Sequence, residues 1–416
     1  MKIVVYTLGC KVNQYESDGI IYNLKQLGHD VSTQLSYADV YILNTCAVTN
    51  EAEKKSRQTI SKLKEFNPNA KILVCGCASQ KNSKQFEKIA GVTYIMGTAN
   101  KLTLVDAIDK IGTNVQEIPN VYNEEFVSMP TKTRAHIKIQ DGCNNFCSYC
   151  IIPYLRGRSR SRDLVEIIKE VDTLSKIVKE IVITGINITD YRIDGELAFN
   201  TLISQLKPYK NTRFRLGSIE QGLITENFIE ELKQINICPH FHLSLQSGCN
   251  SVLKRMNRKY TSKDYAKTIK MIRKHFDNPC ITTDIIVGFP GETKKEFKKT
   301  CRFAKKMGFY NIHIFPYSIR TGTVAEKMPQ IENKIKKQRA KKLAKINEKL
   351  NKKYIKSCKK QTLNVLIEEY DNGYYIGHTE NYIKCYIAEN CWIGEMVKVK
   401  IKKAYKDGAI ALKLSN

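Results

Sequence analysis

The first 125 residues alternate short apolar runs with longer amphipathic segments. Four runs have the length of β-strands, and they read "KIVVYTLG", "DVYILNT", "AKILVCG" and "VTYIMG". Between them lie segments with helical spacing, such as "EAEKKSRQTISKLKEF". Strongly apolar strands joined by helices are typical of a parallel sheet that is covered on both faces. The pattern predicts a doubly wound parallel-sheet domain over residues 1–125.

A second series of strands follows over residues 133–326. Six runs alternate with helical stretches, namely "RAHIKIQDG", "EIVITG", "RFRLGS", "FHLSLQ", "ITTDIIVG" and "NIHIFP". Repeated βα units of this number predict an open, partial (β/α)6 barrel, with the loops at the C-terminal ends of its strands forming the site.

Residues 334–360 form a predicted basic helical linker. Apolar residues recur there at helical spacing, namely Leu343, Ile346, Leu350 and Tyr354. The segment contains thirteen Lys and Arg residues but a single acidic residue, Glu348. One apolar seam with a basic remainder is compatible with a solvated linker or with a helix that contacts phosphates.

The last segment, residues 361–416, offers about five short strands separated by turns such as "DNG" and "KDG". This pattern predicts a small antiparallel β-barrel of the OB kind. In "VKVKIK" the side chains of Lys398, Lys400 and Lys402 alternate with apolar residues and therefore share one face. That face is either an RNA-binding surface or an ordinary solvated one.

Net charge and cysteine content indicate the partner and the compartment of the protein. The formal net charge of the 416 residues is +27, which favours a polyanionic partner. There are fourteen cysteines, no apolar run long enough to span a membrane and no secretory pattern at residue 1. We therefore expect a cytoplasmic protein without a membrane partner, in which thiols serve metals or chemistry rather than disulfides.

Three cysteines lie close together in "GCNNFCSYCIIP", at Cys143, Cys147 and Cys150. Three thiols cannot pair fully as disulfides, and a zinc site would need a fourth ligand nearby. Three thiolates can instead hold three irons of a 4Fe–4S cluster and leave the fourth iron open to a small molecule.

A second set of cysteines follows three of the predicted N-terminal strands. Cys10, Cys46 and Cys77 each come just after a strand, and such positions line one crevice of an open α/β sheet. Cys75 is the rival to Cys77, but it lies within the apolar run. The alternative is that these cysteines are buried as small hydrophobic residues.

Several segments together resemble the radical S-adenosylmethionine methylthiotransferase family. They are "TLGCKVNQYES", "NTCAVT", "GCASQ", "CNNFCSYC", "GRSRSR", "LQSGCNSVLKRMNRKY" and "DIIVGFPGET", and the C-terminal barrel is similar to the family's TRAM domain. The segment "TLGCKVNQYES" is most similar to the bacterial branch that acts on threonylcarbamoyladenosine in tRNA.

The resemblance implies two 4Fe–4S clusters, one on each set of three cysteines, and S-adenosylmethionine at the open iron of the loop cluster. It implies a 5′-deoxyadenosyl radical that attacks C2 of an adenosine beside the anticodon, with sulfur from the second cluster. The expected partners are the tRNA anticodon arm, an electron donor and a sulfur donor. The acid–base chemistry of side chains cannot open an aromatic C–H bond, so a cofactor must supply the radical.

The resemblance also implies roles for several other residues, and some of these residues have an alternative role. Gly185, Gln246 and Asp284 are expected to line the S-adenosylmethionine pocket, although Gln246 and Asp284 fit equally well as supports of barrel loops. Arg156, Arg158, Arg160 and Arg162 either hold substrate phosphates or pin the cysteine loop to acidic neighbours. The rival functions are methylthiolation of isopentenyladenosine in tRNA, methylthiolation of a ribosomal protein, and a non-catalytic iron–sulfur protein that binds RNA.

Overall fold

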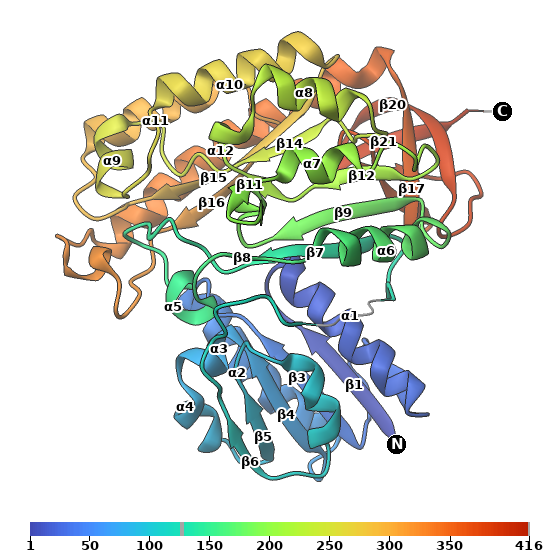
Figure 1. Ribbon diagram of the computed structural model, residues 1–416. Helices are drawn as coiled ribbons and strands as arrows, with labels where there is room; N and C mark the ends of the chain where they lie inside the picture. The colour runs from blue at the N-terminus through green and yellow to red at the C-terminus, as the bar shows by residue number, and fades with distance from the viewer. Residues whose placement is uncertain (125–128, 415–416) are drawn as a thin grey trace.

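The computed structural model describes residues 1–124 and 129–414, so the predicted boundary at residue 125 and the last two residues of the chain lie outside the described residues. Three units follow one another along the chain: an N-terminal sheet, a larger curved sheet wrapped by helices, and a small closed barrel (Figure 1). None of the described helices is both long enough and apolar enough to cross a membrane.

The N-terminal sheet has six parallel strands in the order β2-β1-β3-β4-β5-β6. The four predicted runs form β1 (Lys2–Thr7), β3 (Val40–Thr45), β4 (Lys71–Gly76) and β5 (Val92–Met96). The edge strands β2 (Asp30–Ser32) and β6 (Gly112–Asn114) have three residues each, too few to produce a recognisable pattern.

Helices cover both faces of this sheet, which confirms the doubly wound prediction. One face packs against α1 (Lys11–Gln26) and η1 (Lys101–Ala107). The other packs against α2 (Asn50–Phe66), α3 (Cys77–Lys81) and α4 (Ser83–Glu87). The two faces separate the rival cysteines, because Cys75 belongs to the core beneath α1 and Cys77 to the core beneath α2.

The central unit is an open barrel of six parallel strands, as predicted. Adjacent strands pair in parallel, except that β12 is joined to the segment just before β14 by a single bridge between Phe214 and Ile237. The six are β7 (Ala135–Asp141), β9 (Glu180–Gly185), β12 (Arg213–Leu216), β14 (His240–Leu243), β15 (Cys280–Val287) and β16 (Asn311–Pro316).

The outer face of the curved sheet is covered by helices that share one large apolar core. These helices are α6 (Leu164–Ser175), α7 (Phe199–Ser204), α8 (Glu226–Lys233), α10 (Ser262–His275) and α11 (Lys294–Met307). The basic helix α12 (Asn333–Ser357) packs against β16 and α11, with Leu343 and Ile346 in the same core. It therefore takes the place of the sixth helix of the barrel as well as leading to the last unit.

Short elements complete the central unit and its loops. They are α5 (Ile152–Arg156), α9 (Asn250–Arg255), β8 (Arg160–Ser161), β10 (Arg192–Ile193), β11 (Glu196–Leu197), β13 (Ser218–Ile219), η2 (Ile188–Asp190), η3 (Gln221–Leu223), η4 (Val324–Lys327) and η5 (Cys358–Lys360).

The inner face of the curved sheet is polar. Side chains alternate along a strand, so Ile137 and Ile139 pack under the helices while Lys138 points to the inside. The same alternation on β15 puts Ile281 and Ile285 into the core and Asp284 on the inner face. An interior lined by charged and polar groups is suited to a polar ligand rather than to apolar packing.

The C-terminal barrel is closed and five-stranded, in the order β17-β18-β19-β21-β20. Its neighbouring strands are antiparallel, except that β19 and β21 pair in parallel. The strands are β17 (Thr362–Asp371), β18 (Tyr374–Thr379), β19 (Lys384–Ile387), β20 (Met396–Tyr405) and β21 (Gly408–Lys413). The barrel docks on the central unit, because Arg213 and Arg215 donate hydrogen bonds to four of its backbone carbonyls.

Candidate functional site

Three thiols meet at the C-terminal edge of the N-terminal sheet. Cys10, Cys46 and Cys77 follow β1, β3 and β4 respectively, and the Cys10 and Cys46 thiols both lie within electrostatic range of Cys77. The Cys10 side chain is exposed, whereas Cys46 is buried and burial raises the pKa of its thiol to about 11. The free Cys46 thiol therefore keeps its proton at neutral pH and releases it when a metal binds.

Two glycines leave the room that this site needs. A Cβ atom at Gly9 would lie 2.9 Å from the Cys46 Sγ, and one at Gly76 would lie 2.5 Å from the Thr45 carbonyl oxygen. Both glycines have positive φ angles, 103° and 105°, which favour residues without a side chain. Each glycine directly precedes a cysteine, and this close approach fits a three-thiolate site for a 4Fe–4S cluster. We refer to Cys10, Cys46 and Cys77 as the strand-end site.

Cys75 lies on the other face of the same sheet. Its side chain is fully buried, and burial raises its pKa to about 12. This placement supports Cys77 as the third thiol of the strand-end site, although the choice of ligand stays a prediction.

The loop site consists of Cys143, Cys147 and Cys150, which lie between β7 and α5. Burial raises the pKa of Cys143 to about 11 and that of Cys150 to about 12. Three thiols within one loop fit a 4Fe–4S cluster with one open iron.

The segment after α9 holds the loop site in shape. Asn257 donates a hydrogen bond of 3.0 Å to the carbonyl of Phe146, whose backbone has a φ of 44°. Arg258 donates to the Cys147 Sγ at 3.2 Å and pairs with Glu220 at 3.0 Å. Sequence reasoning included these residues in "RMNRKY" but gave them no role, because their contact with the cysteine loop depends on the fold.

A buried ion network connects the two thiol sites. The Arg156 guanidinium pairs with Glu16 of α1 at 2.8 Å and with Asp141 at the end of β7 at 2.9 Å. It also donates to Asn13 at 2.8 Å, and Asn13 in turn donates to the Thr45 carbonyl, next to Cys46. Arg156 is 1% exposed, so it pins the loop to acidic neighbours and does not contact phosphates.

Glu16 is the centre of this network. Besides Arg156 it pairs with Lys101 and with Lys138 of β7. Burial alone would raise the pKa of Glu16, but the three cations hold that pKa well below its ordinary value. A carboxylate from α1 thus stays charged between both units, which fixes their relative position.

The other arginines of "RGRSRSR" differ in their surroundings. Arg160 donates to the carbonyls of Arg156 and Arg158, and Arg162 pairs with Glu170. Arg158 is exposed over the ring of Phe146, so it is the member of this group best placed to meet a phosphate.

Arg320 is a second buried cation near both sites, a role that the sequence did not reveal. It lies in the loop after β16 and donates to the Val48 carbonyl of the N-terminal unit. Its guanidinium is within electrostatic range of both Cys46 and Cys150. It is 3% exposed and brings positive charge between two sites that become anionic on metal binding.

The three residues expected around S-adenosylmethionine lie at the ends and on the inner face of the curved sheet. Gly185 ends β9, and a Cβ there would lie 2.9 Å from the Gln140 carbonyl oxygen. Gln246 has a φ of 65°, and its backbone N–H donates to the Asp284 carbonyl at 2.8 Å. Their role in binding the cofactor stays a prediction.

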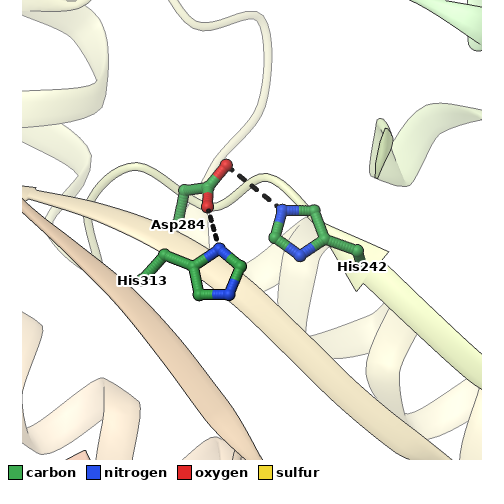
Figure 2. Close-up of side chains that lie close together, drawn as sticks. All are labelled: His242, Asp284 and His313. Carbon is green, nitrogen blue, oxygen red and sulfur yellow. Dashed lines mark hydrogen bonds and ion pairs between the residues drawn. The ribbon is translucent and has the colours of Figure 1, made fainter. Parts of the chain in front are cut away.

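Asp284 belongs to a cluster with two histidines (Figure 2). His242 Nε2 lies 3.1 Å from one carboxylate oxygen and His313 Nδ1 lies 3.2 Å from the other. Burial would raise the pKa of Asp284, but these hydrogen bonds hold the pKa well below its ordinary value. Thr282 fixes the other His242 nitrogen at 3.0 Å, so the cluster presents a charged carboxylate and the ring of His313 to the interior.

Each of the three units matches a known protein family or domain. Residues 2–97 match the model of the Uncharacterized protein family UPF0004, residues 137–304 match the Radical SAM superfamily, and residues 356–411 match the TRAM domain. The threonylcarbamoyladenosine tRNA methylthiotransferase MtaB of Bacillus subtilis is 39% identical over 98% of this chain and 95% of its own length. The chain belongs to the radical S-adenosylmethionine methylthiotransferase family.

Other methylthiotransferases extend the comparison. The threonylcarbamoyladenosine tRNA methylthiotransferase MtaB of Thermotoga maritima is 36% identical over 99% of this chain and 97% of its own length. The tRNA-2-methylthio-N(6)-dimethylallyladenosine synthase of Clostridium novyi is 34% identical over 97% of this chain and 94% of its own length.

Among solved structures, the radical S-adenosylmethionine methyltransferase TsrM of Kitasatospora setae has a TM-score of 0.57 at 12% identity, covering 78% of this chain and 77% of that one. It shows the shared fold.

The basic face of this methylthiotransferase's barrel has the predicted geometry. On β20 the side chains of Lys398, Lys400 and Lys402 are exposed, while Val397, Val399 and Ile401 are buried between them. RNA binding by this face stays a prediction.

Proposed function

We propose that this protein is a tRNA methylthiotransferase that adds a methylthio group to C2 of threonylcarbamoyladenosine next to the anticodon. The observation that carries this proposal is the pairing of two three-thiol sites across one buried ion network. A structural iron–sulfur protein needs no open site facing a second cluster, whereas an insertion of sulfur into a C–H bond needs both. The MtaB relatives support the choice of adenosine.

The cofactors are two 4Fe–4S clusters and S-adenosylmethionine. The thiols of Cys143, Cys147 and Cys150 hold the first cluster, and those of Cys10, Cys46 and Cys77 hold the second. When bound, these groups supply a 5′-deoxyadenosyl radical at the loop site and sulfur and a methyl group at the strand-end site.

The protein itself positions these groups and shields them. Arg258 donates a hydrogen bond to the Cys147 Sγ, which fixes the loop. Arg156 and Arg320 each connect the central unit to the N-terminal unit beside the two thiol sites. Gly185, Gln246 and Asp284 line the side of the interior where S-adenosylmethionine binds, and the surrounding units keep water from the radical.

The substrate is tRNA, and the protein binds it at the anticodon arm. The exposed lysines of α12 and the face formed by Lys398, Lys400 and Lys402 offer positive charge to closely spaced phosphates. An electron donor for the loop cluster and a sulfur donor for the second cluster complete the partners. A reducing cytoplasm fits fourteen cysteines that are all free.

The test is anaerobic incubation of the cluster-loaded protein with S-adenosylmethionine, dithionite and tRNA that carries threonylcarbamoyladenosine. Mass spectrometry of the digested nucleosides should show a methylthio group on that nucleoside, with 5′-deoxyadenosine formed alongside. Modification of dimethylallyladenosine or of a ribosomal protein instead would contradict the proposed substrate. Formation of no 5′-deoxyadenosine by fully loaded protein in the presence of tRNA would favour the non-catalytic alternative.

A further inference from the structure

The strand register brings three side chains that can bind a metal together on the inner face of the curved sheet (Figure 2). Asp284 of β15 lies directly opposite His313 of β16, and His242 of β14 lies opposite Thr282, two residues before Asp284. Residues two apart on a strand point to the same side, so all three side chains face the interior. We refer to His242, Asp284 and His313 as the inner-face triad.

Asp284 differs from Glu16, Asp141 and Glu180, the buried carboxylates that pair with Lys or Arg side chains. Within residues 1–124 and 129–414, Asp284 forms no ion pair with Lys or Arg, although only 22% of its side chain is exposed. Its carboxylate has only the rings of His242 and His313 as side-chain partners there. A carboxylate that is largely removed from water is stabilised by a cation, and a metal ion would supply one.

The distances within the inner-face triad suit a first-row transition metal. His242 Nε2 and His313 Nδ1 lie 3.1 and 3.2 Å from the Asp284 carboxylate, and the ligand atoms of all three side chains lie within 4.8 Å of one another. Metal bonds of about 2.1 Å at tetrahedral or octahedral angles separate neighbouring ligand atoms by about 3.0 to 3.4 Å. Small rotations of these side chains are therefore enough for one ion to contact all three.

Thr282 orients one of the two histidines. Its hydroxyl oxygen lies 3.0 Å from His242 Nδ1, whereas His242 Nε2 is the nitrogen that faces Asp284. A histidine that binds a metal through one nitrogen usually donates a hydrogen bond from the other, which fixes its tautomer and the direction of its ring. A proton on Nδ1 that is donated to Thr282 leaves the lone pair of Nε2 free for a metal ion.

Three protein ligands leave a metal ion open toward the interior. The side chain of His313 is 51% exposed, so this side of the inner-face triad is not closed by packing. Two histidines and one carboxylate are typical of sites that bind Zn²⁺ or Fe²⁺ and keep one or more positions for water or another ligand. A closed structural zinc site would instead have four protein ligands.

We propose that His242, Asp284 and His313 bind one divalent transition-metal ion that is separate from the irons of the two thiol sites and is open to a further ligand. The inference rests on these three side chains and does not depend on the proposed function.

The test measures Zn²⁺ binding by the cluster-loaded protein, under anaerobic conditions and without S-adenosylmethionine or RNA. Equilibrium dialysis at buffered free Zn²⁺ concentrations in the micromolar range and below, followed by elemental analysis, gives zinc and iron per chain. Wild type should bind one zinc ion, and His313→Ala and Asp284→Asn should lose it. Thr282→Val should bind zinc about tenfold to a hundredfold more weakly, the usual cost of removing the partner of a metal-bound histidine.

His275→Ala is the matched control. His275 also lies beside carboxylates, those of Glu226 and Glu230, but on the outer helices, so this variant should bind zinc as wild type does. Iron should stay at its wild-type level while zinc binds, and X-ray absorption at the zinc edge should show nitrogen and oxygen ligands without sulfur.

Three results would overturn the inference. The first is that wild type binds no zinc in this concentration range, and the second is that His313→Ala and Asp284→Asn bind zinc as tightly as wild type. The third is sulfur ligation of the zinc or a release of iron that matches zinc uptake, because both would place the zinc on the cysteines.

Discussion

The two thiol sites reach similar chemistry by opposite routes. The loop site draws three thiols from one short segment, Cys143 to Cys150, and is held by local turns and by contacts from Asn257 and Arg258. The strand-end site draws one thiol from each of three strands and exists only when the parallel sheet has formed. The spacing of the cysteines along the sequence therefore identifies the loop site, whereas the strand-end site is identified by the topology of the sheet.

The two sites also differ in how they depend on the contact between units. Both lie against Arg156, but the loop site is connected to it through Asp141 and the strand-end site through Asn13 and Glu16. A change in one site's own residues should therefore stay local, whereas a change in the shared network should affect both.

Replacement of Arg156 by Gln should give the largest effect. It removes one cation from a buried network of two carboxylates, and such a loss typically costs about 3 to 5 kcal/mol of the free energy of unfolding. Chemical denaturation of the metal-free protein measures this change. The exposed Arg158→Gln is the matched control and should stay within about 0.5 kcal/mol of wild type. Equal stability of both variants would show that the network does not hold the units together.

Replacement of Arg258 by Gln should separate the two sites functionally. The variant loses the hydrogen bond to the Cys147 Sγ, so S-adenosylmethionine cleavage should fall about tenfold, equivalent to one charge-assisted hydrogen bond. The strand-end cluster should keep its iron. Formation of 5′-deoxyadenosine and iron content are measured together, with the exposed Lys254→Gln as control. Loss of iron from both sites would mean that Arg258 acts on the fold rather than on the loop site.

Replacement of Lys398, Lys400 and Lys402 by Gln should give the smallest effect, because the face lies on the C-terminal barrel and contributes to neither thiol site. Affinity for tRNA should fall, and the dependence of log affinity on log salt should become shallower by about 0.7 to 0.9 for each lost phosphate contact. S-adenosylmethionine cleavage without tRNA should be unchanged. Titrations of tRNA binding at several salt concentrations measure this change. Identical slopes for wild type and the triple variant would mean that the exposed lysines of α12 provide most of the phosphate contacts.

Much of the fold could be predicted because its signals are local. The ten long apolar runs all became strands, and the seam of Leu343 and Ile346 correctly predicted a helix with one buried side. The docking of that helix on β16 was missed, since a basic helix with one apolar seam looks the same as a linker. Edge strands of three residues left no pattern at all.

The sequence predicted those parts of the site that contain cysteines next to glycines. It did not predict contacts between side chains that lie far apart in the sequence. The crowding of Gly9 and Gly76 against the next strand follows from their place before cysteines at strand ends. Arg320 carries no such mark. Its neighbours come from another unit of the chain, so only the assembled structure shows that it lies near both thiol sites.

Iron content of the wild type and of three cysteine variants decides whether the protein holds two separate three-thiol sites. After anaerobic reconstitution, wild type should hold about eight irons per chain, because each three-thiol site binds one 4Fe–4S cluster. Cys143→Ala and Cys77→Ala should each keep about four, from opposite sites, and Cys75→Ala should keep about eight. About four irons in the wild type, or loss of iron in Cys75→Ala but not in Cys77→Ala, would contradict this account.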